Sequence, residues 1–165
     1  MPFRMVDRID NYEAGISLRA RKLTSAHEDY WVRLRELPVM PAELILESFL
    51  QAAGLLVILS TDAPTYAALP TSIGRVSRLG SVVPGDVLLL EIHVDRFDDE
   101  IAVFSGNVSV RDRAVLSVGS AMFVMTRLET LADPVDVIPR LARLRRDPIA
   151  ESPGGAGPLS FLAPS

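Results

Sequence analysis

A single long apolar segment, residues 41–60, constrains the fold of this 165-residue chain most strongly. Pro41 suits the first position of a helix, because its missing N–H would have no partner there. Beyond Phe49 the segment is apolar on nearly every side, which indicates a helix wrapped by other elements. We therefore expect one helix from about residue 41 to about residue 60, buried in the centre of the domain.

The polar positions of this segment argue against a membrane span. They are spaced four residues apart and form one stripe over the first turns of the helix. The uninterrupted apolar part, residues 52–60, falls well short of the ~20 apolar residues that a span needs. We expect no membrane association. The stripe consists of Glu43, Glu47 and Gln51. We expect Glu43 to be solvated and take Glu47 and Gln51 as candidate site residues.

Strand signals surround the helix. Residues 15–24 alternate apolar and polar side chains, as in a half-buried strand. Residues 61–71 are rich in turn formers, with Pro64 and Pro70 as breakers. β-Branched and aromatic residues then predict a meandering antiparallel sheet with strands over 73–83, 87–94, 101–110 and 114–125. One long helix against one such sheet is an α+β plan, with the helix on the concave face.

Composition limits the classes of function. With 17 Lys and Arg against 21 Asp and Glu, and no basic stripe interleaved with aromatics, nucleic acid is a poor partner. The absence of cysteine rules out disulfides and thiolate zinc sites, and we expect no metal and no cofactor. The N-terminal segment does not resemble a secretory signal, so we expect a soluble, cytoplasmic protein.

The character of the chain changes near residue 129, where prolines and then glycines become frequent. We predict a main domain over residues 1–128 and a C-terminal extension over residues 129–165. In the extension, residues 136–146 predict a short basic helix, and the last dozen residues predict a flexible tail. This basic stretch is either a docking surface for an acidic partner or an ordinary solvated helix face.

Three motifs in register resemble one family. They are PVMPAELILESFLQ at residues 38–51, PFRMVDR at residues 2–8 and VVPGD at residues 82–86. Together they resemble the β-hydroxyacyl-acyl-carrier-protein dehydratases, the FabZ/FabA-like branch of the hot-dog superfamily. The resemblance covers roughly residues 2–126 and implies a hot-dog fold, an antiparallel sheet wrapped around one long central helix.

The resemblance also implies site residues. In that family a histidine of one subunit and an acid on the central helix of the other face the bound thioester. The acid corresponds to Glu47, six residues after Pro41, and the backbone N–H that holds the thioester carbonyl corresponds to Ala42. Met40, Pro41 and Gln51 are then expected to line the pocket. The substrate would be an acyl-carrier-protein or coenzyme A thioester.

The histidine of the family falls at Arg33, in an element that departs from the family pattern throughout. Arginine remains protonated in water and offers only hydrogen-bond donors, so it cannot act as a base. Arg33 either pairs with Glu47 across a subunit boundary, binds an anion, or points outward. His27 and His93 are the only histidines, and no family role corresponds to either.

Our leading hypothesis is a 3-hydroxyacyl-thioester dehydratase subunit of fatty-acid or polyketide biosynthesis that is not self-sufficient. It would form a homodimer, or a heterodimer with a histidine-bearing hot-dog homologue that supplies the missing base. A positioned general base increases the reaction rate by a factor of about 10² to 10⁴, so the chain alone should have almost no dehydratase activity.

Two alternatives remain open. One is a hot-dog acyl thioesterase in which Glu47 activates water, and the other is a non-catalytic acyl-binding or scaffold subunit. Glu47 itself has a plain structural explanation, because acidic side chains near a helix start complement the macrodipole. Arg75 and Arg78 are weaker candidates for docking a carrier protein.

Overall fold

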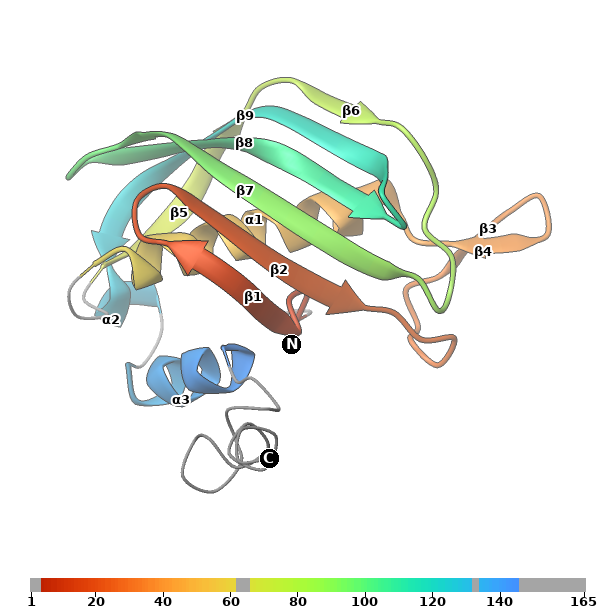
Figure 1. The fold of residues 1–165 in the computed structure, drawn as a ribbon, viewed down its shortest axis with the longest axis horizontal. Helices are drawn as coiled ribbons and strands as arrows, with labels where there is room; N and C mark the ends of the chain where they lie inside the picture. The colour runs from red at the N-terminus through yellow and green to blue at the C-terminus, as the bar shows by residue number, and fades with distance from the viewer. Residues whose placement is uncertain (1–3, 62–65, 132–133, 146–165) are drawn as a thin grey trace, which may run out of the picture.

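The computed structural model describes residues 4–61, 66–131 and 134–145, so the predicted tail lies outside the described part. A seven-stranded antiparallel sheet curves around one long helix, α1 (Ala42–Leu59), which lies on its concave face (Figure 1). The strand order is β1-β2-β7-β8-β9-β5, and β6 also pairs with β9. The strands are β1 (Arg8–Glu13), β2 (Ser17–Leu23), β5 (Tyr66–Ile73), β6 (Val76–Arg78), β7 (Val87–Phe97), β8 (Ile101–Val110) and β9 (Arg113–Arg127).

The core forms where α1 meets the sheet. Buried residues run along α1 from Ile45 to Val57, and alternate residues of β7, β8 and β9 face them. Phe104 and Phe123 meet edge to face, with ring centroids 5.2 Å apart. Although α1 has the length and composition of a membrane span, it is the core helix of this sheet, as the sequence predicts.

A glycine allows the sheet to bend closely over α1. Gly106 of β8 has a φ of 154°, and the ladder between β7 and β8 packs directly above Phe49. A Cβ atom there would lie 1.9 Å from the carbonyl oxygen of Glu91 and 3.0 Å from Cε2 of Phe49. Only glycine fits this position without displacing the backbone of β7.

The predicted strands are confirmed over 101–110 and nearly so over 114–125, but the prediction for residues 61–83 was wrong. β5 occupies Tyr66–Ile73 and so overlaps the stretch 61–71 that we expected to be turns. Of the predicted strand 73–83, only residue 73 and β6 (Val76–Arg78) are strand, and residues 79–83 belong to no strand. Pro70 interrupts neither the strand nor the sheet, because β5 is an edge strand with an irregularity between Pro70 and Ser72.

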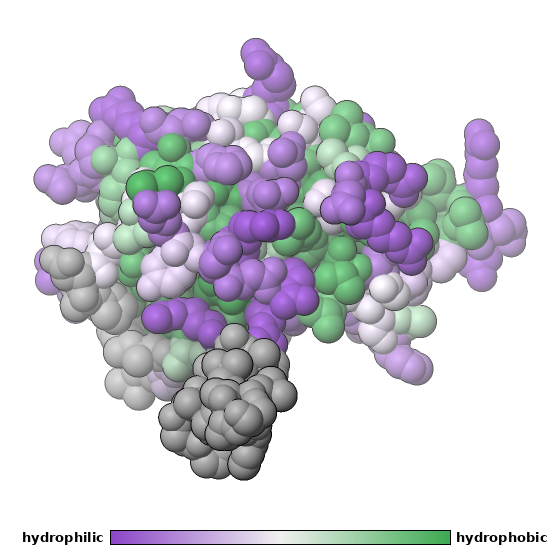
Figure 2. Space-filling model, in the orientation of Figure 1, coloured by the Kyte–Doolittle hydropathy of each residue, from purple (hydrophilic) through white to green (hydrophobic). Residues whose placement is uncertain are grey.

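A small hairpin before α1 was not predicted. Strands β3 (Val32–Leu34) and β4 (Leu37–Val39) pair outside the main sheet and project from one end of the molecule (Figure 1). Three of its side chains are large, apolar and about half exposed, and the surface around the hairpin is correspondingly apolar in Figure 2. They are Val32, Leu34 and Leu37.

The C-terminal extension folds back onto the domain. The short helix α2 (Leu128–Leu131) follows β9, and α3 (Pro134–Leu144) lies beside β1 (Figure 1). Leu141 and Leu144 of α3 are buried in the main core cluster, and the Arg145 guanidinium lies 5.4 Å from the ring centre of Tyr12. The predicted basic helix therefore exists, displaced by two residues at each end.

Candidate active site

Glu47 lies on the second turn of α1, half-buried, and its carboxylate is held in place by its neighbour one turn on. Gln51 Nε2 donates a hydrogen bond of 2.9 Å to Glu47 Oε1. Gln51 Oε1 in turn accepts a hydrogen bond of 2.9 Å from the backbone N–H of Met5. The N-terminal segment thus orients Gln51, and Gln51 orients one carboxylate oxygen, which leaves the other oxygen of Glu47 for a ligand.

The start of α1 supplies free backbone donors one and a half turns before Glu47. Pro41 is the N-cap residue and makes no side-chain cap, while its carbonyl accepts from the N–H groups of Leu44 and Ile45. Within the described residues, no hydrogen bond involves the Ala42 N–H. An unpaired amide at a helix start, aligned with the helix dipole, is suited to hold a developing negative charge on oxygen.

The loop before β7 fixes the position of this helix start. Met40 N–H donates to the carbonyl of Val82 at 2.9 Å, so the loop and the chain entering α1 are joined directly. The buried Asp86 holds that loop, because its Oδ2 accepts from Val83 N–H at 2.9 Å. Met40 itself is fully buried in the core, whereas Pro41 is partly exposed.

Arg33 lies on strand β3 of the projecting hairpin, outside the main sheet. Its side chain is 76% exposed and forms an ion pair of 3.3 Å with Glu36, which is also exposed. In the turn that joins β3 to β4, Arg35 and Glu36 have positive φ. Within one chain, then, Arg33 points outward and makes no described contact with Glu47.

The two histidines lie on separate parts of the described chain. His93 is exposed on β7, between the buried Ile92 and the half-buried Val94, and so faces away from α1. His27 is exposed in the loop after β2, where its N–H donates to Ser25 Oγ. No described hydrogen bond or ion pair joins either histidine to Glu47.

Arg75 and Arg78 lie on the exposed edge formed by β5 and β6. Arg78 Nη2 donates to Ser81 Oγ at 3.3 Å, and the Arg75 carbonyl accepts from Gly119 N–H. No described hydrogen bond or ion pair joins either arginine to the site residues on α1.

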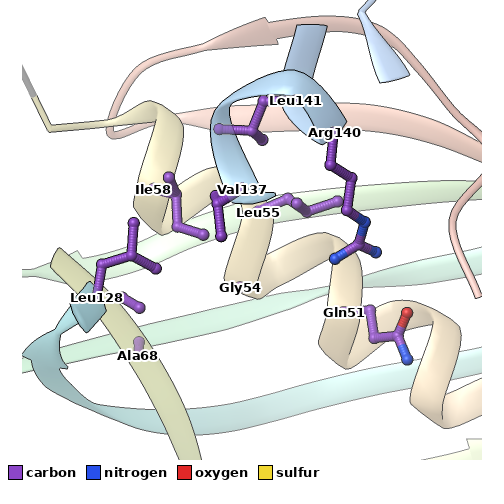
Figure 3. Close-up of a pocket in the computed structure, with 10 residues that line it drawn as sticks. Gln51, Gly54, Leu55, Ile58, Ala68, Leu128, Val137, Arg140 and Leu141 are labelled. Atoms are coloured by element: carbon purple, nitrogen blue, oxygen red, sulfur yellow. The ribbon is translucent and has the colours of Figure 1, made fainter. Parts of the chain in front are cut away.

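A pocket adjoins the site on the side where the extension covers α1. Its volume is about 190 Å³, and its walls come from α1, β5, α2 and α3 (Figure 3). Gln51 lines one end, so the pocket begins one turn beyond Glu47. Sequence reasoning missed the contribution of α3, although the amphipathic pattern of this basic helix was a usable signal.

Comparisons with known proteins identify the family. A FabA-like domain model matches residues 1–119. The chain is 36% identical over 119 residues to the 3-hydroxyacyl-[acyl-carrier-protein] dehydratase FabZ of Aliivibrio fischeri, an alignment covering 70% of this chain and 79% of that protein. It is 32% identical over 128 residues to the FabZ of Ruminiclostridium cellulolyticum, covering 76% and 89%.

Solved structures support the same fold. The fluoroacetyl-CoA thioesterase FlK aligns with a TM-score of 0.59 at 14% identity, covering 79% of this chain and 97% of that one. The protein smu.793 of Streptococcus mutans, bound to acetyl CoA, aligns with a TM-score of 0.54 at 18% identity, covering 73% and 86%. With its sheet wrapped around α1 and its sequence match to the FabZ enzymes, the chain belongs to the FabA-like family and has the hot-dog fold.

Proposed function

We propose that this protein is the acid-bearing subunit of a cytoplasmic 3-hydroxyacyl-thioester dehydratase, and that a histidine-bearing hot-dog homologue supplies the base. The observation that carries the proposal is the arrangement on α1. A carboxylate held by Gln51 lies about one and a half turns beyond the unpaired Ala42 amide. The names of the related FabZ proteins supply the substrate class, a 3-hydroxyacyl group on an acyl carrier protein.

The two groups on α1 have complementary roles in dehydration. The Ala42 N–H donates a hydrogen bond to the thioester carbonyl oxygen, which gains negative charge when the α-proton leaves. Glu47, in its protonated form, donates a proton to the departing β-hydroxyl, which leaves as water. Gln51 is a positioning residue, because it fixes one oxygen of Glu47 and so directs the other toward the substrate.

The α-proton must be removed by another group. Arg33, the position that corresponds to the family histidine, cannot accept a proton. His93 faces away from α1, and no described hydrogen bond or ion pair joins His27 to Glu47. A base from a second subunit would complete the site. This is the basis for proposing a heterodimer, in either a fatty-acid or a polyketide pathway.

A free sheet edge offers a surface for that second subunit. β5 and β6 end the sheet, and large apolar side chains along them are exposed, among them Leu69 at 47% and Val76 at 38%. An exposed apolar edge strand is suited to pair with another strand. The exposed apolar side chains of the β3–β4 hairpin are a second contact surface of the same kind.

The decisive experiment compares the purified chain alone with the chain bound to the hot-dog homologue that co-purifies with it. We expect α,β-unsaturated thioester, followed by its absorbance, only from the pair. In the pair, Glu47→Gln should lower kcat by about 10² to 10⁴, the usual contribution of a general acid. Glu43→Gln, one turn earlier on the same helix and exposed, is the matched control and should leave kcat unchanged.

Other outcomes would contradict the proposal. Full dehydratase activity of the chain alone would show that no partner base is needed. Release of free thiol from a saturated acyl thioester, lost in Glu47→Gln, would favour a thioesterase in which Glu47 activates water. Turnover by the pair that survives Glu47→Gln would make this chain a scaffold or acyl-binding subunit.

A further inference from the structure

The N-terminal segment and the C-terminal extension bring three arginines together, and no described ion pair joins any of them to a carboxylate. Arg4, Arg140 and Arg143 line one depression on the surface between the N-terminal segment and α3. None of their side chains forms an ion pair or hydrogen bond with the rest of the described chain. Asp7 lines the same depression, but its Oδ2 is occupied by Leu23 N–H at 2.7 Å and Lys22 Nζ at 3.3 Å.

Arg140 is the member of this cluster that is partly buried. Its side chain extends from α3 toward α1, and its guanidinium points to the face of α1 that carries Gly54 and Gln51 (Figure 3). Burial, with the repulsion of Arg4 and Arg143, lowers the pKa of Arg140. A half-buried cation without a counter-charge is costly, so this position favours an anion.

The pocket next to Arg140 is apolar. Beyond the guanidinium its walls are aliphatic side chains from three helices, and Arg140 and Gln51 are its polar members. Gly54 opens the floor, since a Cβ atom added there would meet nothing within 4 Å, although glycine inside a helix is unfavourable. The aliphatic walls include Leu55, Ile58, Leu128, Val137 and Leu141.

We propose that α1 and α3 form a binding site for a carboxylate carried on an aliphatic chain, with the carboxylate on Arg140 and the chain in the pocket beyond it. Guanidinium binds carboxylate through two parallel hydrogen bonds, and Arg4 and Arg143 add positive potential at the mouth. Aliphatic walls select an apolar chain. Arg140 and Arg143 lie outside the residues matched by the family model, so the carboxylate end of this site is additional to the dehydratase centre, while Gln51 lies between the two.

Calorimetric titration of the full-length chain with octanoate tests the site. We expect one octanoate per chain, with acetate and octan-1-ol each binding at least about tenfold more weakly, as loss of a charged hydrogen bond or of apolar burial predicts. Arg140→Met should reduce octanoate affinity to that of octan-1-ol, whereas Arg140→Lys should retain most of it. Gly54→Leu, which fills the pocket, should abolish binding with the arginines intact.

The control is Arg113→Met, which removes an exposed arginine that lines a different depression and should leave octanoate binding unchanged. Thermal unfolding of each variant shows that it is folded at the titration temperature. Equal affinity for octan-1-ol and octanoate would overturn the proposal, because the pocket would then be only an apolar surface. So would inorganic phosphate binding as tightly as octanoate, or unchanged binding by Arg140→Met.

Discussion

At the scale of single residues, Gly106 is a position where a side chain would clash with the backbone of the sheet. Its Cα lies where β8 passes directly over Phe49 and next to the backbone of β7. We expect Gly106→Ala to destabilise the fold by about 3 kcal/mol or more, because both the clash and the positive φ oppose a side chain. Urea unfolding measures the change.

Gly54→Ala is the matched control for that prediction. Gly54 is helical and has open space at its Cβ position, so this variant should be neutral or more stable by up to about 1 kcal/mol. Equal losses of stability in Gly106→Ala and Gly54→Ala would show that β8 does not pack closely on Phe49.

A second prediction at this scale concerns acid stability. Burial raises the pKa of Glu28, but hydrogen bonds from Tyr30, Lys22 and the Ser25 amide outweigh it and lower that pKa below the ordinary value of 4.5. The folded chain therefore binds this proton less readily than the unfolded chain, so the stabilisation is present above pH 4.5 and is lost as the pH falls through the lowered pKa.

Glu28→Gln should consequently lower stability at pH 7 and have progressively less effect below pH 4.5. Unfolding by urea at a series of pH values measures both. Glu36→Gln is the control, because Glu36 is exposed and its pair with Arg33 adds little to stability. If Glu28→Gln changed stability equally at every pH, the lowered pKa of Glu28 would be contradicted.

At the scale of elements, the turn at residues 82–86 determines where α1 begins. It binds Met40 N–H through the Val82 carbonyl, and Asp86 closes the turn from within. We expect Asp86→Ala to cost about 1–3 kcal/mol, because the buried Val83 N–H loses its acceptor. The control, Asp99→Ala, changes an exposed carboxylate in another turn and should be close to neutral.

Because that turn also supports the helix start, Asp86→Ala should reduce activity by more than the loss of folded protein explains. Comparing kcat of the pair at a temperature where the variant is fully folded separates the two effects. Unchanged kcat there would mean that the Ala42 amide does not depend on this turn.

At the scale of the whole molecule, the exposed edge of the sheet is the surface through which we expect subunits to join. Leu69→Lys introduces a charge in the middle of β5, and edge charges oppose strand pairing. Sedimentation velocity should show a dimeric protein that becomes monomeric in Leu69→Lys. The control, Ile16→Lys, changes an exposed apolar residue in the β1–β2 turn and should remain dimeric. If Leu69→Lys also remained dimeric, the β5 edge would be excluded as the interface.

The sequence by itself determined the central helix and most of the later strands, because these follow from local periodicity over a few residues. The family, and Glu47 as the candidate acid, came from the resemblance of three motifs to the FabZ/FabA-like dehydratases. The β3–β4 hairpin escaped prediction because Arg35 and Glu36 adopt positive φ without the glycine or asparagine that signals such a turn. The same geometry at Arg111 and Asp112 was predicted as a turn, because polar residues there separate two clear strands.

Only the tertiary structure decided what surrounds the site. The partner of Gln51 is Met5, 46 residues away, and Arg140 reaches the same helix from the far end of the chain. β5 tolerates Pro70, because it lies at the end of the sheet and its pairing with β9 is irregular between Pro70 and Ser72. Such contacts form when helices and strands pack against one another. The residues they join are far apart in the sequence, so no local sequence pattern predicts them.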